Sequence, residues 1–145
     1  MLQSGSRWRG IVHFENAADL EAIFGYWPSF HDAEVLRVVL DRSGDEGPTL
    51  QIVIQVFEMT SEVDAKGYYV LKNHTEVALS FTKVVVSRLQ WFNHQNVLSS
   101  LEIDEIDPAA TRVGDVELPS SFGLEAVFEC ERAIVTDVRS FESAV

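Results

Sequence analysis

Most of this chain alternates apolar and polar residues with the two-residue period of half-buried β-strands. The pattern is clearest at residues 34–41 and 49–59, where the run Ser43–Pro48 between them predicts a hairpin loop. Other strands are predicted at residues 11–14, 68–89, 113–118, 122–130 and 133–138, with a bulge or bend at 72–74 and a tight hairpin at Glu131-Arg132 joining the last two.

One segment follows the helical period instead. Leu20, Ile23 and Phe24 form an apolar stripe, Asn16 is the predicted N-cap, and Gly25 the predicted stop. A helix this short needs a sheet face to lie on. The pattern therefore predicts an α+β fold, with a single antiparallel twisted sheet of about six to seven strands and one short N-terminal helix on a face. One domain is expected over residues 1–145, with residues 1–9 flexible.

The stretch YWPSFHDAEV, Tyr26–Val35, joins the predicted helix to the first clear strand. Proline fixes its own φ and disfavours the helical region for the residue before it, so a bend is expected here. We interpret Trp27, Pro28, Phe30, His31 and Asp32 as the residues that hold this bend. In this interpretation the two aromatic side chains pack against the core, and truncation of Trp27 to alanine should be strongly destabilising.

A chemical interpretation of the same stretch stays open. A His–Asp pair can serve as an acid–base pair or as half a metal site. Adjacent residues in an extended segment point to opposite faces, however, which makes direct cooperation awkward. The alternative function is thus a small-ligand- or metal-binding enzyme in which His31, Asp32, His74 and His94 converge. The four histidines follow no metal-binding spacing, and the chain has no phosphate loop or nucleophile elbow. We therefore expect no catalytic residue, metal ligand or cofactor.

Charge narrows the choice of partner. The chain has 11 Lys and Arg against 23 Asp and Glu, a formal net charge of −12. Nucleic acid and anionic membranes are poor partners for such a surface, whereas a basic protein suits it, although acidity can also serve solubility alone. Cys130 is the only cysteine, which excludes an internal disulfide, and it is expected to be a small buried residue. With no signal peptide or membrane-spanning run in the sequence, the cytoplasm is the expected location.

A candidate partner surface lies late in the chain. Glu102, Asp104, Glu105 and Asp107, here called the acidic run, follow a loop that contains Trp91, Phe92 and His94. Interfaces take their energy from a few aromatic anchors, while peripheral charge mainly speeds encounter. We expect the acids to steer a basic partner and the loop to contact it. The alternative is that the acids only protect an edge strand. The sequence leaves the oligomeric state open.

Several segments together resemble the immunity protein 50 family, a family of bacterial polymorphic-toxin immunity proteins. The segments are FGYWPSFHDAEVLRVVLDR (24–42), QIVIQVFEM (51–59), VALSFTKV (77–84), LQWFNHQNVLSSLEI (89–103) and GLEAVFECERAIV (123–135). The resemblance implies a small cytoplasmic protein that binds and neutralises a cognate toxin domain and catalyses nothing. It implies no particular binding residue. A basic toxin domain such as a nuclease would match the acidic composition.

Overall fold

The computed structural model describes residues 14–104 and 114–141, which contain one helix and eleven strands. In chain order the elements are β1 (Phe14–Glu15), α2 (Ala17–Phe24), β2 (Glu34–Asp41), β3 (Thr49–Val63), β4 (Tyr69–Thr82), β5 (Val85–Gln90), β6 (Val97–Leu98), β7 (Glu102–Asp104), β8 (Gly114–Leu118), β9 (Ser120–Phe122), β10 (Glu125–Cys130) and β11 (Arg132–Ser140). The one described helix is not long and apolar enough to cross a membrane.

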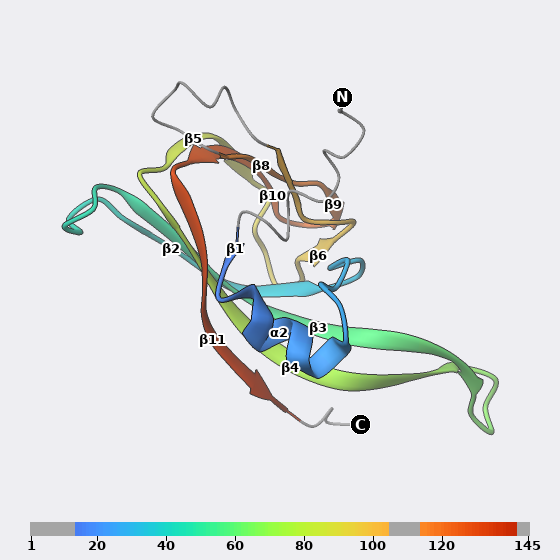
Figure 1. Ribbon diagram of the computed structural model, residues 1–145. Helices are drawn as coiled ribbons and strands as arrows, with labels where there is room; N and C mark the ends of the chain where they lie inside the picture. Colours follow the sequence, from blue (N-terminus) through green and yellow to red (C-terminus); the bar gives the residue numbers. More distant parts are fainter. Residues whose placement is uncertain (1–13, 105–113, 142–145) are drawn as a thin grey trace, which may run out of the picture.

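The strands form two sheets, not the single sheet that the alternation predicted. Sheet A has seven strands in the order β1-β11-β4-β3-β2-β6-β9, and sheet B has four in the order β5-β10-β8-β7 (Figure 1). Sheet A is also mixed, because β1 pairs with β11 in parallel while its other pairs are antiparallel. The α+β content and the single short helix agree with the prediction.

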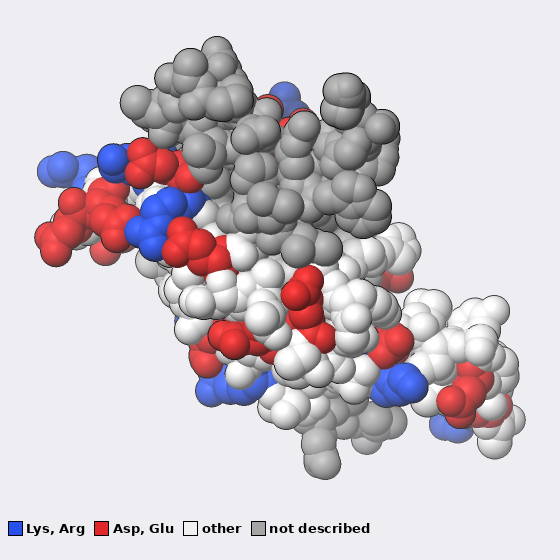
Figure 2. All heavy atoms as spheres, viewed as in Figure 1, with Lys and Arg blue, Asp and Glu red and all other residues white. Residues whose placement is uncertain are grey.

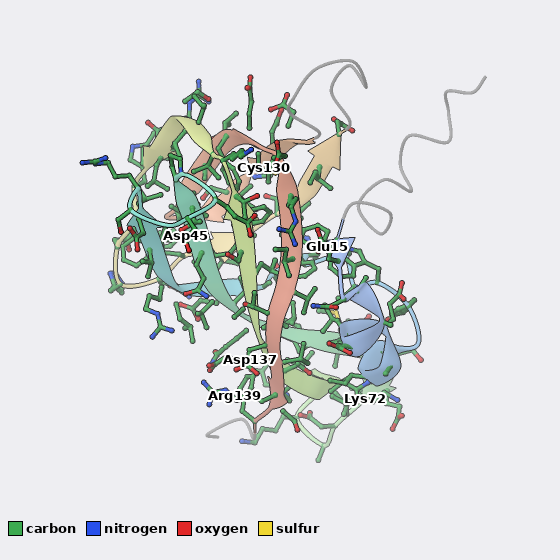
Figure 3. All side chains as sticks on the ribbon, turned by 60° about the vertical axis from the view of Figure 1, so that its left-hand side comes forward. Glu15, Asp45, Lys72, Cys130, Asp137 and Arg139 are labelled. Atoms are coloured by element: carbon green, nitrogen blue, oxygen red, sulfur yellow. The ribbon has the colours of Figure 1, made fainter. Side chains whose placement is uncertain are left out.

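The extra sheet arises where long predicted strands change sheets. The predicted strand 68–89 is two strands, β4 in sheet A and β5 in sheet B, and the chain turns between them at Lys83, whose φ is 50°. The predicted hairpin at Glu131-Arg132 is wrong for the same reason. There β10 leads directly from sheet B into β11 of sheet A, and each strand pairs with other partners. Cys130 ends β10 and is buried, as expected (Figure 3).

One face of sheet A carries the core. Phe81 of β4 has edge-on ring contacts with Phe128 of sheet B, at 4.9 Å between centroids, and with Phe14 of β1, at 5.9 Å. The helix α2 contacts β11 and β4 and buries Ala17, Leu20 and Phe24 (Figure 1). Sheet B, β1 and α2 therefore share one apolar core with sheet A.

The ends of α2 show one expected and one unexpected contact. Gly25 adopts a left-handed φ of 83°, and its N–H donates to the carbonyl of Glu21, which ends the helix as predicted. Asn16 occupies the N-cap position, but its side chain makes no capping hydrogen bond. Its Nδ2 instead donates to the carbonyl of Val135 at 3.2 Å, which ties the start of the helix to β11.

Two hairpins extend from the body at opposite ends, marked by Asp45 in the β2–β3 turn and Lys72 on β4 (Figure 3). The β3–β4 hairpin is the longer one. Neither β2 nor β11 pairs with it beyond Val56 and Thr75, so residues 57–73 form a two-stranded ribbon, here called the arm. Acidic side chains are spread over the face seen in Figure 2, with a dense group at the β2–β3 end and others on the arm.

Candidate functional site

The family-like stretch forms a loop, residues 25–33, here called the motif loop, that is fixed along its length. Phe30 and Asp32 both have a φ of 63°, a left-handed conformation that turns the chain sharply. The N–H of Asp32 donates to the carbonyl of Leu98 at 2.9 Å, and the N–H of Leu98 donates to the carbonyl of Ala33 at 2.9 Å. Backbone pairing with β6 therefore holds the end of the loop.

Aromatic rings hold the other half of the motif loop. Trp27 lies between Phe14, at 4.7 Å between centroids, and Phe30, at 5.6 Å. Phe30 is 2% exposed and belongs to the core, whereas Trp27 is partly exposed and packs against it. Pro28 is also buried. These contacts are the ones expected if the aromatic side chains of the motif hold the bend by packing against the core.

His31 and Asp32 lie closer together than the sequence suggested. The Nε2 atom of His31 is 3.6 Å from Oδ2 of Asp32, and both side chains are largely exposed. The expectation of opposite faces was wrong because it assumed extended backbone, and the positive φ of Asp32 turns the chain instead. The Nδ1 atom of His31 lies 3.0 Å from the carbonyl oxygen of Ser99, and the backbone N–H of His31 donates to Ser29 Oγ. The histidine thus also joins the loop to the segment after β6.

The four residues of the enzyme alternative do not form one site. Asp32 and His74 line a common hollow of about 310 Å³ with Phe57, whereas His31 lines the neighbouring hollow. His94 lies against Phe122, with 6.4 Å between ring centroids. Within residues 14–104 and 114–141, no group of three or more His, Cys, Asp or Glu side chains could hold a metal ion.

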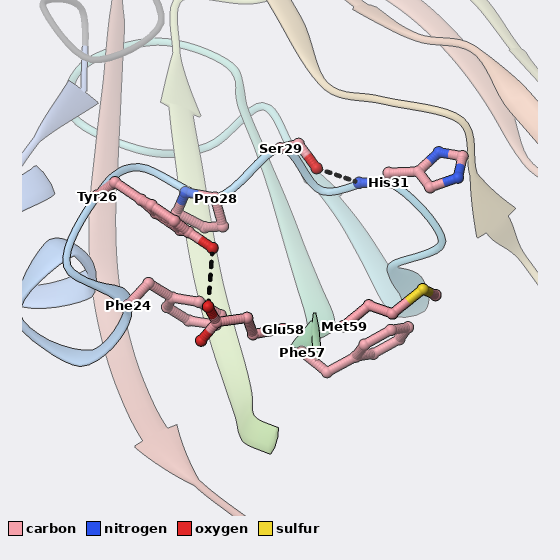
Figure 4. A pocket seen from close by; sticks show the side chains of 8 residues that line it. All are labelled: Phe24, Tyr26, Pro28, Ser29, His31, Phe57, Glu58 and Met59. Atoms are coloured by element: carbon pink, nitrogen blue, oxygen red, sulfur yellow. Dashed lines mark hydrogen bonds between the residues drawn. The ribbon is translucent and has the colours of Figure 1, made fainter. Parts of the chain in front are cut away.

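A hollow of about 220 Å³ lies between the motif loop and the root of the arm (Figure 4). Its apolar walls come from Phe24, Tyr26, Pro28, Phe57 and Met59. Its polar groups belong to Ser29, His31 and Glu58. The hydroxyl of Tyr26 donates to Oε2 of Glu58 at 3.2 Å. Partial removal from water and the negative charge of Glu58 raise the pKa of the Tyr26 phenol.

The arm carries apolar side chains on a ribbon that has no third strand among the described residues. Tyr68 is 69% exposed and Tyr69 is 59% exposed, and three further arm residues expose large apolar side chains: Met59, Val63 and Leu71. Sequence reasoning missed this surface. The available signal was a pair of tyrosines directly after the turn glycine Gly67, since adjacent residues on a strand cannot both face a core.

The loop predicted to contact a partner, residues 91–95, is exposed and firmly held; we call it the aromatic loop. Trp91 is 64% exposed and Phe92 is 51% exposed. Beneath them, the buried Asn96 accepts hydrogen bonds at Oδ1 from the N–H groups of Asn93, at 2.9 Å, and Leu124, at 3.0 Å, and donates from Nδ2 to the carbonyl of Asn93. These hydrogen bonds tie the middle of the loop to Asn96.

An apolar hollow of about 320 Å³ adjoins this loop. Val38 and Leu40 of β2 line one side, and Leu89 of β5 and Phe92 line the other. On its outer edge β2 pairs only through Glu34, with Val97 of β6, so that within the described chain no strand covers that edge from Leu36 to Asp41. The hollow thus lies between the aromatic loop and β2.

The described members of the acidic run, Glu102 and Asp104, lie apart from the aromatic loop. Glu102 and Asp104 are exposed on β7, one edge strand of sheet B, whereas the loop follows β5, the opposite edge strand. Two strands, β8 and β10, separate them. Glu105 and Asp107 lie outside the described residues. Glu102 and Asp104 therefore do not form one compact patch with the aromatic loop.

A small β-rich domain whose prominent surface features are apolar hollows, exposed aromatic side chains and scattered acids is typical of a protein that binds another protein. The comparison of sequences makes this specific. The chain belongs to the family described as Immunity protein 50, whose match covers residues 16–141 and so includes every described element after β1. Comparisons with curated proteins and with solved structures gave no match. The family makes this an immunity protein, for which the implied partner is a protein toxin, and the resemblance in the sequence is confirmed.

Proposed function

We propose that this protein binds the toxin domain of a polymorphic toxin system in the bacterial cytoplasm and neutralises it by forming a stable complex. The family match over residues 16–141 carries the proposal. The net charge of −12 supports a basic toxin domain, such as a nuclease, because opposite charge speeds encounter and complements the interface. The protein itself acts by binding and catalyses nothing.

Part of the contact is assigned to the aromatic loop and its hollow. Exposed tryptophan is enriched among the residues that dominate binding energy, and apolar hollows accept the anchors of a partner. Because hydrogen bonds between Asn93 and Asn96 already hold the loop, little conformational freedom is lost when a partner binds to Trp91, Phe92 and His94.

The function is tested with the toxin encoded directly before this gene, since an immunity gene is expected to follow the gene of its toxin. Expression of that toxin domain alone should stop growth of the host cell, and coexpression of this chain should restore it. The two purified proteins should form a complex that size-exclusion chromatography resolves. A toxin that kills equally well in the presence of this chain, with no complex formed, would contradict the proposal.

The acidic run is expected to accelerate association instead of anchoring the complex. Changing Glu102, Asp104, Glu105 and Asp107 to their amides should slow association and flatten its salt dependence, because long-range attraction between charges is screened by salt. The melting temperature should stay nearly unchanged, since the described members of the run, Glu102 and Asp104, are exposed. Stopped-flow association rates at several ionic strengths measure the effect.

A matched control replaces four acids at the two hairpins, Asp45, Glu46, Glu62 and Asp64, by their amides. The same change in net charge there should have the smaller effect on the association rate. If the hairpin variant is the slower of the two, the steering surface lies at the hairpins and the acidic run only protects the edge strand β7.

A further inference from the structure

We propose that the hollow between the motif loop and the arm receives an arginine or lysine side chain of the toxin domain, and that the arm forms the apolar contact around it. This inference rests on the proposed function, because the partner is taken to be the toxin. It concerns a surface whose lining includes no residue of the aromatic loop.

The walls of the hollow fit the stem of a long cationic side chain. Phe24, Tyr26 and Pro28 come from the end of α2 and the motif loop, and Phe57 and Met59 come from β3 on the other side (Figure 4). Arginine and lysine commonly lay their methylene groups along apolar surface. The aromatic rings also attract a cation near their faces. At about 220 Å³, the hollow is of the size of one side chain and not of a larger ligand.

Glu58 supplies the charge. Among the described residues it is the only carboxylate that lines the hollow, and two hydrogen bonds fix it, from the hydroxyl of Tyr26 to Oε2 and from Nδ2 of Asn73 to Oε1 at 2.8 Å. Each carboxylate oxygen has a second lone pair and can accept a further hydrogen bond. A partly buried carboxylate held in place in this way suits a guanidinium or an ammonium group.

The surroundings of the hollow suit a protein partner. A two-stranded ribbon is only marginally stable by itself in water, yet the arm exposes Met59, Val63, Tyr68, Tyr69 and Leu71. Tyrosine and methionine are enriched where proteins contact one another. A second copy of this chain is disfavoured as the occupant, since both copies have a net charge of −12, whereas a basic toxin domain complements this charge.

The test compares Glu58→Gln with Glu62→Gln, which removes the same charge from the exposed arm beyond the hollow. Binding to the toxin domain is measured by calorimetry. Loss of a charge-assisted hydrogen bond at an interface should weaken affinity about ten- to a hundredfold in Glu58→Gln, and Glu62→Gln should stay within about twofold of the wild type. Equal affinities of the two variants would overturn the inference while leaving the proposed function intact.

Two further measurements separate the hollow from folding and from the toxin. Tyr26→Phe removes the hydrogen bond to Glu58 but keeps the ring and the carboxylate, so it should retain most of the affinity if the charge of Glu58 is what matters. Nα-acetyl-arginine amide, titrated into the free protein, should shift the NMR signals of Tyr26, Phe57 and Met59, while its neutral isostere Nα-acetyl-citrulline amide should not. Equal responses to the two compounds, or none, would show that the hollow does not select a cation, whether or not the toxin binds.

Discussion

Truncation of Phe30 to alanine is expected to lower the free energy of unfolding by about 3–5 kcal/mol. Phe30 is 2% exposed and contacts Trp27, so removal of its ring leaves a cavity in the core. Phe30 also has a φ of 63°, and alanine keeps that strain without the ring contacts that offset it. Urea unfolding, followed by circular dichroism, measures the change.

Alanine variants of two neighbouring aromatic residues provide comparisons for Phe30→Ala. Trp27→Ala should fall at the lower end of the same range, because Trp27 is partly exposed although it contacts both Phe14 and Phe30. Tyr26→Ala should cost only about 0.5–1 kcal/mol, since Tyr26 is exposed. If Phe30→Ala or Trp27→Ala instead melts like the wild type and loses toxin binding, the motif serves recognition and not the bend.

Substitution of Gly123 by alanine is expected to destabilise the protein by about 2–4 kcal/mol, from overpacking together with backbone strain. Gly123 has a φ of 79°, and a Cβ there would overlap the carbonyl oxygen of Gln95 and come within 2.7 Å of Oδ1 of Asn96. Asn96 holds the aromatic loop, so the same change should also displace Trp91 and Phe92 and weaken toxin binding. Thermal and urea unfolding report the stability, and calorimetry reports the binding.

Gly67 offers a matched control for Gly123. It has a similar φ of 89°, but a Cβ there would meet nothing within 4 Å. Gly67→Ala should therefore show the cost of the left-handed backbone alone, about 1 kcal/mol. If the two variants lose equal stability, the contact between Gly123 and the aromatic loop contributes nothing, and the loop is held by other means.

The spacing of apolar residues and the positions of turn residues were enough to predict the helix and the first hairpin. The apolar stripe and Gly25 predicted the position of α2 correctly. The alternation on both sides of Ser43–Pro48 predicted the β2–β3 hairpin. The division into two sheets depends instead on which distant strands pair. Alternation continues from β4 into β5, and only the backbone turn at Lys83 and the separate partners of the two strands reveal the change of sheet.

For the candidate surfaces, too, some features could be predicted from the sequence and others could not. Exposed aromatic residues in the aromatic loop could be predicted because Asn93 to Asn96 broke the strand pattern. The separation of that loop from Glu102 and Asp104 could not, because it depends on β5 and β7 being opposite edge strands of sheet B. The hollow beside Glu58 could not be predicted from the sequence either, since it is formed by the motif loop and a strand about thirty residues further along the chain.

The parallel pairing of β1 with β11 sets the order in which the protein can be completed. Phe14 pairs with Ala133, and Asn16 donates to the carbonyl of Val135, so β1 and the start of α2 complete their contacts only when β11 is in place. Contacts of such long sequence separation form late and slowly. The helix and the aromatic side chains beside it must therefore wait, incompletely covered, until residues 132–140 have been synthesised, and a cell that makes this protein and its toxin together gains the fully folded protein only after translation has passed that strand.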